Sequence, residues 1–368
     1  MIFSPIRFRL RNLKSKLLLK LEFNHSGRPT RQIVGYGTDI LIIAPGEMPI
    51  PNNGWGAVEF LIEKQFQNFV NAGIQTGILN SWFHRDWLKV YLRRPKVILL
   101  HYDIFAKRCF FYKVLLPRTP VFIVSHFGYS AFPEKFGKGF FKQLYWINKM
   151  DVVIALSSKI KEVWRKLGVT KNIIVVGNGA DVSDFGSPVV KDRDIVYLGK
   201  VEPRKRQIEV AQTISEAVQI DYVGPIVDSN FEQLKFSLAN KFLGSWTREE
   251  VNLNLSRYKV LLLWSDGEAD ALVLYEAQAA GCSIVVSRNA LGNQNPDLPW
   301  IYIVKDLNQL ESTLLLAIEQ NKLFKNTIIE YAKREYSWQL NSKKLLEIFA
   351  QGFGMNCKPK LSDQLPRV

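Results

Sequence analysis

Short apolar runs alternate with longer amphipathic stretches through most of this 368-residue chain. Such runs suit strands that are buried on both faces of a sheet, and the stretches between them are long enough for crossover helices. Strands linked by helices form parallel sheets with helices on both faces. Strands are predicted at 39–44, 74–79, 96–101, 120–125, 151–155 and 172–176, and then at 194–198, 219–223, 259–264, 282–287 and 300–304. The predicted helices include 57–72, 157–168, 205–217, 247–256, 271–280 and 308–320.

The predicted strands fall into two series, separated by the polar stretch 181–194. A chain of this length is also too long for one ordinary core. The sequence therefore predicts an α/β fold of two Rossmann-like domains. The expected parts are a basic amphipathic segment at 1–32 that ends in a linker at 24–32, an N-terminal domain at 33–185, a C-terminal domain at 186–335, a final helix at 336–352 and a mobile tail at 353–368.

Positive charge is concentrated in the first half of the chain. Residues 1–150 hold 22 Lys and Arg against 8 Asp and Glu, whereas residues 151–368 hold 27 against 26. This asymmetry indicates a polyanionic partner, such as anionic lipid, nucleic acid or an acidic ligand, rather than a device for solubility. In the segment 85–149, cations are interleaved with aromatic side chains, which suits the surface of an anionic membrane. Residues 1–21 place leucines at helical spacing among six cations, which fits either an interfacial helix or one packed on its own domain.

Several classes of protein are disfavoured by what the sequence lacks. No apolar run approaches the roughly 20 residues of a membrane-spanning helix, and the N-terminus lacks the pattern of a secretory signal. Cys109, Cys282 and Cys357 are too far apart for a metal motif and indicate reduced thiols in a cytosolic protein. The four histidines have no metal-binding spacing, and no DxD pair follows a strand, so no catalytic metal is expected.

Polar and glycine residues follow the predicted strands, where open parallel sheets bind their ligands. Gly54 and Gly56 begin a helix, which suits the approach of a phosphate to backbone N–H groups, although a plain glycine turn has the same composition. Lys200 and Lys205, after another strand, could hold a diphosphate, although a solvated basic turn would look alike. His126, also at a strand end, is either a buried core histidine or a ligand-binding group.

The stretch EADALVLYEAQAAG places Glu268 just before a helix and Glu276 within it. Glu276 lies among leucine, valine and alanine residues, where a carboxylate is costly unless it accepts hydrogen bonds in a cleft. The two hydroxyls of a ribose could supply those donors. A solvated helix glutamate is the alternative, so the interpretation depends on the combination with Lys200 and Lys205.

These residues together resemble the glycosyltransferase family 4, retaining enzymes of the GT-B fold that use nucleotide-sugar donors. The resemblance runs from about residue 40 to about residue 350. It rests on two glutamates with seven residues between them followed by AQAAGCSIVVS, on the Gly199, Lys200 and Lys205 element, on VVGNGADVSDF at 175–185 and on the glycine loop at 52–56. YSWQLNSKKLLEIF at 336–349 looks like the closing helix of the family, which often crosses back to the N-terminal domain.

The resemblance implies roles for individual residues. Lys200 and Lys205 would hold the donor diphosphate as it leaves, and Glu276 would accept the ribose hydroxyls. Glu268 and the backbone after it would bind the sugar, which His126 would also contact. The implied catalytic residues are His126, Lys200, Lys205 and Glu268. The implied donor-binding residues are Gly54, Gly56, Asn178, Lys200, Lys205, Leu243, Gly244, Asp270, Ala271, Leu272 and Glu276, with no metal and no cofactor.

Three residues depart from the family pattern. Lys200 stands where arginine is usual, Arg206 replaces a common glycine, and Asp270 stands within a usual Gly-Phe-Gly run, which leaves the donor sugar in doubt. UDP-glucose is favoured over GDP-mannose only by frequency in the family. The expected partners are a nucleotide sugar, a glycan or lipid-linked acceptor and an anionic membrane, with peripheral attachment to the inner face of the plasma membrane and a role in cell-envelope or extracellular glycan synthesis. The alternatives are a non-catalytic nucleotide-sugar scaffold, a nucleic-acid-binding module, which would leave the glutamates unexplained, and a UDP-sugar 2-epimerase.

Overall fold

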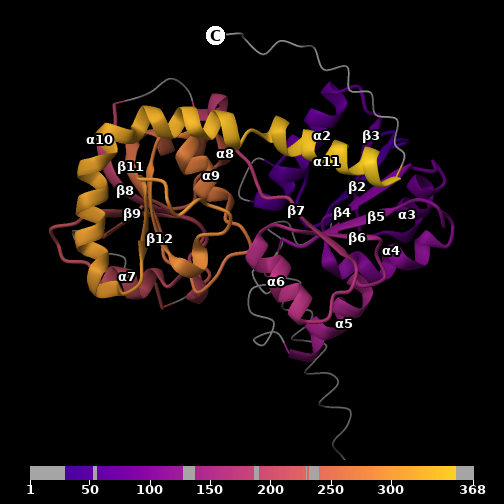
Figure 1. The fold of residues 1–368 in the computed structure, drawn as a ribbon, viewed down its shortest axis with the longest axis horizontal. Coiled ribbons are helices and arrows are strands. Elements are labelled where there is room, and N and C mark those ends of the chain that lie inside the picture. Colours follow the sequence, from indigo (N-terminus) through magenta and orange to yellow (C-terminus); the bar gives the residue numbers. More distant parts are fainter. Residues whose placement is uncertain are drawn as a thin grey trace, which may run out of the picture.

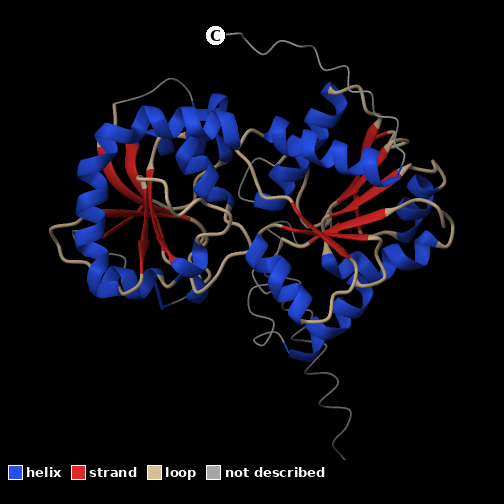
Figure 2. Cartoon of the chain, in the orientation of Figure 1, coloured by secondary structure: helices blue, strands red, loops and turns tan. Residues whose placement is uncertain are grey.

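The computed structural model of this protein describes residues 30–52, 56–126, 137–185, 190–228, 230–231 and 240–353. These residues form two α/β lobes that lie side by side, each with a central sheet flanked by helices (Figures 1 and 2). Gly54, residues 1–29 of the expected N-terminal segment, and the tail 354–368 with Cys357 lie outside the described residues. The fold is thus the α/β arrangement with two sheets that the apolar runs predict.

The N-terminal lobe is built on a seven-stranded sheet with the order β1-β3-β2-β4-β5-β6-β7. Its strands are β1 (Arg31–Gly35), β2 (Ile40–Ile43), β3 (Thr76–Ser81), β4 (Val97–Leu100), β5 (Val121–Val124), β6 (Val152–Ala155) and β7 (Asn172–Val175). Strands β2 to β7 pair in parallel and coincide with the first predicted series.

Strand β1 corrects two expectations. It begins within the segment 24–32 that is predicted to be a linker, and it pairs antiparallel with β3. The sequence RQIVG lies at the edge of the sheet and is only partly buried, so it lacks the continuous apolar run that marks the central strands.

The C-terminal lobe contains a six-stranded parallel sheet with the order β10-β9-β8-β11-β12-β13. Its strands are β8 (Arg193–Leu198), β9 (Ile220–Val223), β10 (Asn240–Phe242), β11 (Tyr258–Leu263), β12 (Ser283–Ser287) and β13 (Ile301–Val304). Only the short edge strand β10 is missing from the second predicted series. The chain thereby places the carboxyl ends of β8, β9 and β11 together in the middle of this sheet.

The helices of the N-terminal lobe are α2 (Ala57–Asn71), α3 (His84–Tyr91), α4 (Ala106–Lys113), α5 (Gly137–Ile147) and α6 (Ser158–Lys166). Those of the C-terminal lobe are α7 (Gln207–Thr213), α8 (Arg248–Asn254), α9 (Leu272–Ala279) and α10 (Leu310–Glu335). Helix α10 continues well beyond the predicted end at residue 320. Within the described ranges, no helix combines the length and the apolar character that crossing a membrane requires.

Helix α11 (Trp338–Phe353) follows α10 and packs on α2 of the N-terminal lobe (Figure 1). Trp338 and Phe349 are fully buried there. The ring of Phe349 lies 4.7 Å from that of Phe122 in β5 and 6.4 Å from that of Phe69 in α2, measured between ring centroids. Aromatic packing of this kind anchors the end of the described chain to the lobe in which it began.

Candidate active site between the lobes

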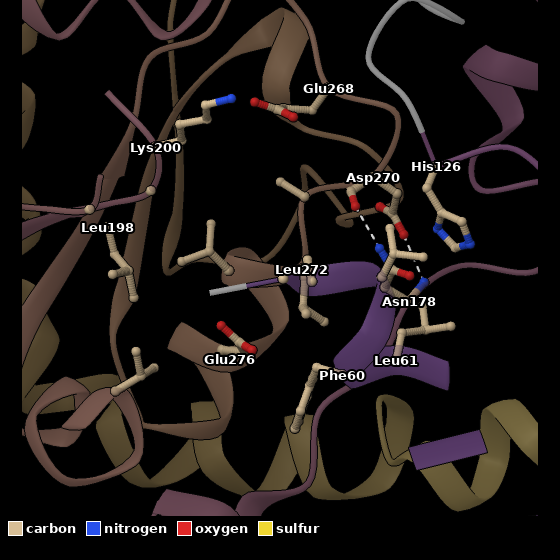
Figure 3. A pocket seen from close by; sticks show the side chains of 18 of the residues that line it. Phe60, Leu61, His126, Asn178, Leu198, Lys200, Glu268, Asp270, Leu272 and Glu276 are labelled. Atoms are coloured by element: carbon tan, nitrogen blue, oxygen red, sulfur yellow. Dashed lines mark hydrogen bonds between the residues drawn. The ribbon is translucent and has the colours of Figure 1, made fainter. Parts of the chain in front are cut away.

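A cavity of about 330 Å³ lies between the two lobes, at the carboxyl ends of both sheets. Its walls include His126, Leu156 and Asn178, which follow strands of the N-terminal lobe, and Lys200, Gly224 and Glu268, which follow strands of the C-terminal lobe. The cavity brings together most of the predicted site residues: Gly56, His126, Asn178, Lys200, Lys205, Glu268, Asp270, Ala271, Leu272 and Glu276. Figure 3 shows Lys200 and Glu268 on one side of it and His126 and Asn178 on the other.

Two predicted residues, Leu243 and Gly244, are described but do not line this cavity. They follow β10, where the Gly244 carbonyl accepts a 2.9 Å hydrogen bond from the N–H of Gly224. Gly224 does line the cavity, so the loop after β10 lies immediately behind its wall. The contact of Leu243 and Gly244 with a nucleobase stays a prediction.

Lys205 and Glu268 face each other at the C-terminal side of the cavity. The Nζ atom of Lys205 lies 3.7 Å from Oε1 of Glu268, and Nη1 of Arg204 lies 2.8 Å from the same oxygen. Burial opposes ionisation of Glu268, but the charges of Lys205 and Arg204 outweigh it and hold its pKa below the usual value. Glu268 is therefore ionised beside two cations. The partnership with Arg204 is not evident from the sequence, because it depends on the pairing of β8 with β11, which brings the segments after these two strands together.

The lysine turn differs from the predicted helix 205–217. Pro203–Lys205 forms a single 3₁₀ turn, and Arg206 adopts a left-handed conformation with φ 50° before α7 begins at Gln207. The residue that departs from the glycine of the family therefore occupies a conformation that glycine adopts most readily. Lys205 reaches back toward the end of β8, where a Cβ atom on Gly199 would lie only 2.8 Å from its Nζ atom. Glycine at position 199 thus leaves the space that the ammonium group occupies.

Two helices begin at the cavity without a side-chain cap. Gly56 precedes α2 and Ala271 precedes α9, and the structure shows no side-chain hydrogen bond to either N-terminus among the described residues. The first residues of both helices line the cavity. Uncapped backbone N–H groups and the helix dipole favour a negatively charged ligand at such a place.

Glu276 is buried in α9 and forms an ion pair with Arg248 of α8. The guanidinium of Arg248 also lies 4.1 Å from the ring centroid of Phe60, which belongs to α2 of the other lobe. Arg248 lines the cavity, and its Nε atom is buried without a partner among the described residues. The sequence does contain a signal for Arg248, because a cation in the first turn of a helix opposes the helix dipole and is costly without a second role.

Asp270 lies against the cavity but is bound by the protein itself. Its carboxylate accepts hydrogen bonds from the N–H of Asn178 at 2.8 Å, the hydroxyl of Tyr275 at 2.7 Å and the N–H of Asn293 at 3.2 Å. The side-chain amide of Asn178 donates to the Asp270 carbonyl. The carboxylate that departs from the family pattern thus joins the two lobes, and a direct contact with the donor sugar stays a prediction.

His126 lies at the end of β5 and retains some exposure toward the cavity. Its Nε2 atom lies 2.8 Å from Nδ1 of His101, which follows β4 and is fully buried. Burial lowers the pKa of His126 to about 3, and burial and the neighbouring His126 lower that of His101. Both imidazoles are therefore neutral near pH 7, and His101 is a residue of this site that the sequence analysis does not identify.

Residues 30–184 match the family described as Glycosyltransferase Family 4. No curated protein sequence matches the chain significantly. Among solved structures, that of Anabaena HepE in complex with UDP and glucose has a TM-score of 0.66 at 13% identity, and the match covers 85% of this chain and 100% of HepE.

Two further solved structures are similar in the same way. Sucrose-phosphate synthase from Thermosynechococcus elongatus has a TM-score of 0.69 at 14% identity, with 85% of this chain and 98% of that chain covered. The lipopolysaccharide outer core galactosyltransferase WaaB has a TM-score of 0.61 at 18% identity, with 85% and 99% covered. These likenesses confirm the GT-B fold, with one cleft between two Rossmann-like lobes.

Proposed function

We propose that this protein, a glycosyltransferase of the family 4 type, transfers a hexose from a nucleotide-sugar donor with retention of configuration at the transferred carbon. The observation that carries the proposal is the convergence of Lys200, Lys205, Glu268 and Glu276 on one cavity between the lobes. They come from three separate parts of the C-terminal lobe, and polar and charged groups that converge on one cavity are typical of a ligand-binding site.

The distribution of charge in the cavity matches its parts to different parts of the donor. Lys200, Lys205 and the uncapped start of α9 form the positive part of the cavity, which suits the diphosphate. As the bond between the sugar carbon and the phosphate oxygen breaks, these groups stabilise the charge on the leaving diphosphate. The acceptor oxygen bonds to the same carbon, its proton passes to the departing diphosphate, and the oxocarbenium-like sugar between them lies beside the ionised Glu268.

The nucleoside would lie deeper, along α9. Glu276 is the carboxylate at that side, and its ion pair with Arg248 orients it into the cavity wall. We propose that Glu276 accepts the ribose hydroxyls. UDP-glucose is the favoured donor, since HepE is known in complexes with UDP and with UDP-glucose, and GDP-mannose is the next candidate. No metal or cofactor is proposed, because the two lysines supply the positive charge.

A surface of the N-terminal lobe supports peripheral attachment to an anionic membrane and a lipid-linked or oligosaccharide acceptor. Exposed apolar side chains gather on or just after α3, α4 and α5, namely Leu88, Leu92, Phe111, Val114, Leu115 and Tyr145. Cations lie among them: Nζ of Lys107 is 5.6 Å from the ring centroid of Trp146, and Nζ of Lys149 is 5.1 Å from that of Tyr145. Helices α3 and α4 lie on the side of this lobe that faces away from the other lobe (Figure 1).

Membrane attachment is tested by co-sedimentation of the full chain with phosphatidylglycerol vesicles at low salt, with phosphatidylcholine vesicles as the control. Each cation near an anionic surface contributes about 1 kcal/mol, so the double variant Lys107→Glu/Lys149→Glu should bind at least tenfold more weakly. Equal binding of both proteins, or none, would remove this surface from the proposal. The proposed role in cell-envelope or extracellular glycan synthesis depends on a lipid-linked acceptor.

Transfer itself is tested by a donor panel. A thermal-shift series with UDP, GDP and ADP identifies the base, since a ligand at 100 times its Kd stabilises by about 2.7 kcal/mol. Consumption of the matching nucleotide sugar, with the configuration of the product read by NMR, then tests catalysis and retention. A protein that binds the nucleotide sugar but never consumes it with any acceptor would instead be a scaffold of GT-B shape.

A further inference from the structure

Two histidines from neighbouring strands form a pair at the N-terminal wall of the cavity. The Nδ1 atom of His101 lies 2.8 Å from Nε2 of His126, and the two rings are nearly coplanar, with centroids 5.1 Å apart and an interplanar angle of 13°. A hydrogen bond between two neutral imidazoles has one donor and one acceptor, so it can be made in only two ways. Either His101 donates from Nδ1, or His126 donates from Nε2.

The surroundings of His101 decide between these two arrangements. Its remaining ring nitrogen, Nε2, is buried and has no partner among the described residues. If His126 donated, this Nε2 would carry a hydrogen in a place where nothing accepts it, and orphaned buried N–H groups are rare and costly. If His101 donates from Nδ1, its Nε2 is only an unused lone pair. An unused buried acceptor is less costly than an unused buried donor, so the arrangement in which His101 donates is the favoured one.

The consequence reaches the cavity through His126. When its Nε2 accepts from His101, the hydrogen of the neutral imidazole must lie on Nδ1. In Figure 3 one ring nitrogen of His126 is directed toward Asn178 and Asp270, and the other away from them. We propose that His101 is a positioning residue that holds His126 as its Nδ1–H tautomer, so that a neutral hydrogen-bond donor faces the donor sugar.

The sugar contact rests on the function proposed above, whereas the tautomer does not. A neutral donor suits this place, because a charged imidazolium would repel the positive charge that develops on the sugar during transfer. The burial that lowers the pKa of both histidines keeps His126 uncharged. An imidazole with its lone pair toward the sugar could only accept from a hydroxyl, so loss of His101 changes the kind of hydrogen bond without removing the ring.

NMR of the full chain labelled with ¹⁵N-histidine tests the tautomer directly, because the sequence has only four histidines. Absence of its signals in His126→Ala assigns His126. The wild type should show His126 with a protonated Nδ1 and a bare Nε2. His101→Leu should lose this pattern, whereas His101→Asn, whose amide can donate from a similar position, should keep it. A protonated Nε2 on His126 in the wild type would overturn the proposal.

Kinetics then separate positioning from a purely structural role. We expect His101→Leu to lower kcat by about 10–100-fold, below the 10²–10³ typical of removing a donor outright, and His101→Asn to stay within about threefold of wild type. In the His126→Ala background, His101→Leu should have no further effect. An equal loss in both backgrounds, or full turnover of His126→Ala, would overturn the link to catalysis. If wild type consumes no donor at all, the proposed function fails, and the tautomer measurement still decides the pair.

Discussion

The backbone N–H of Asn178 in the N-terminal lobe donates a 2.8 Å hydrogen bond to the carboxylate of Asp270 in the C-terminal lobe. Two glycines leave room for that carboxylate. A Cβ atom on Gly177 would lie 3.1 Å from one of its oxygens, and one on Gly292 would lie 2.5 Å from the other. Asp270 thus connects the two lobes by a hydrogen bond at the wall of the cavity. Its ionisation should therefore change the free energy of unfolding as well as the charge of the cavity wall.

Asp270→Asn should change how stability depends on pH. Burial raises the pKa of Asp270 from 3.8 to about 6, despite the hydrogen bonds that it accepts. Between these values the folded chain holds a proton that the unfolded chain releases, so the free energy of unfolding falls as pH rises through this window. Removing the group should make that slope less negative by up to about 1.4 kcal/mol per pH unit. Urea denaturation of both proteins between about pH 4 and 7 measures it, and parallel curves would show that Asp270 does not titrate there.

The ion pair between Arg248 and Glu276 should be strongly coupled. Their side chains are 20% and 6% exposed, so removing one partner leaves the other charge largely buried. We expect Arg248→Met to lower the free energy of unfolding by about 1–3 kcal/mol, less than for a fully buried pair. Adding Glu276→Gln should restore part of that loss, and a double-mutant cycle in urea measures the coupling energy. A coupling energy indistinguishable from zero would mean that the pair does not persist in solution.

Lys205→Ala should lose turnover by about 10²–10³, because in the proposed mechanism the ammonium beside Glu268 stabilises the leaving diphosphate as charge develops on it. Initial rates of donor consumption measure the loss, and thermal unfolding checks that the variant is folded. Lys305→Ala, an exposed lysine outside the cavity, is the matched control and should keep wild-type rates. Unchanged turnover in Lys205→Ala would remove this lysine from the mechanism.

Chelation should leave the enzyme active. In the proposed mechanism, Lys200 and Lys205 supply the positive charge for the diphosphate, and no divalent ion would be needed for that purpose. We expect the rate of transfer in excess EDTA to equal the rate with added Mg²⁺ or Mn²⁺ within about twofold. Restoration of a lost activity by one of these ions would contradict the metal-free mechanism.

Arg206→Gly should be more stable than Arg206→Ala. Both changes remove the contacts of the side chain with Glu209 and Trp264, so the comparison isolates the backbone at φ 50°. In the folded chain, the left-handed conformation favours glycine over alanine by about 1–2 kcal/mol. The greater freedom of glycine in the unfolded chain offsets part of this. A net difference of about 0.5–1 kcal/mol in urea is expected. An alanine variant as stable as the glycine variant would show that the turn relaxes.

The sequence by itself determined the architecture, because strands buried on both faces must be continuously apolar. Runs such as Ile40–Ile43 and Val97–Leu100 are recognisable without any knowledge of their neighbours. The edge strands β1 and β10 escaped prediction for the same reason, since an edge is only partly buried and carries no such run. Many of the residues that line the cavity could also be named in advance, some because polar side chains follow strands in parallel sheets and others because the family resemblance marks them.

Only the tertiary structure decided which of these side chains act on one another. Arg248 reaches Glu276 from another helix, His101 reaches His126 from the neighbouring strand, and Asp270 reaches Asn178 across the two lobes. Local sequence fixes where a strand ends and a helix begins, because hydrophobic periodicity is a short-range property. Hydrogen bonds and ion pairs depend on distances of about 3 Å between segments that are remote in the chain, and these are set only when both sheets and the cleft between them have formed.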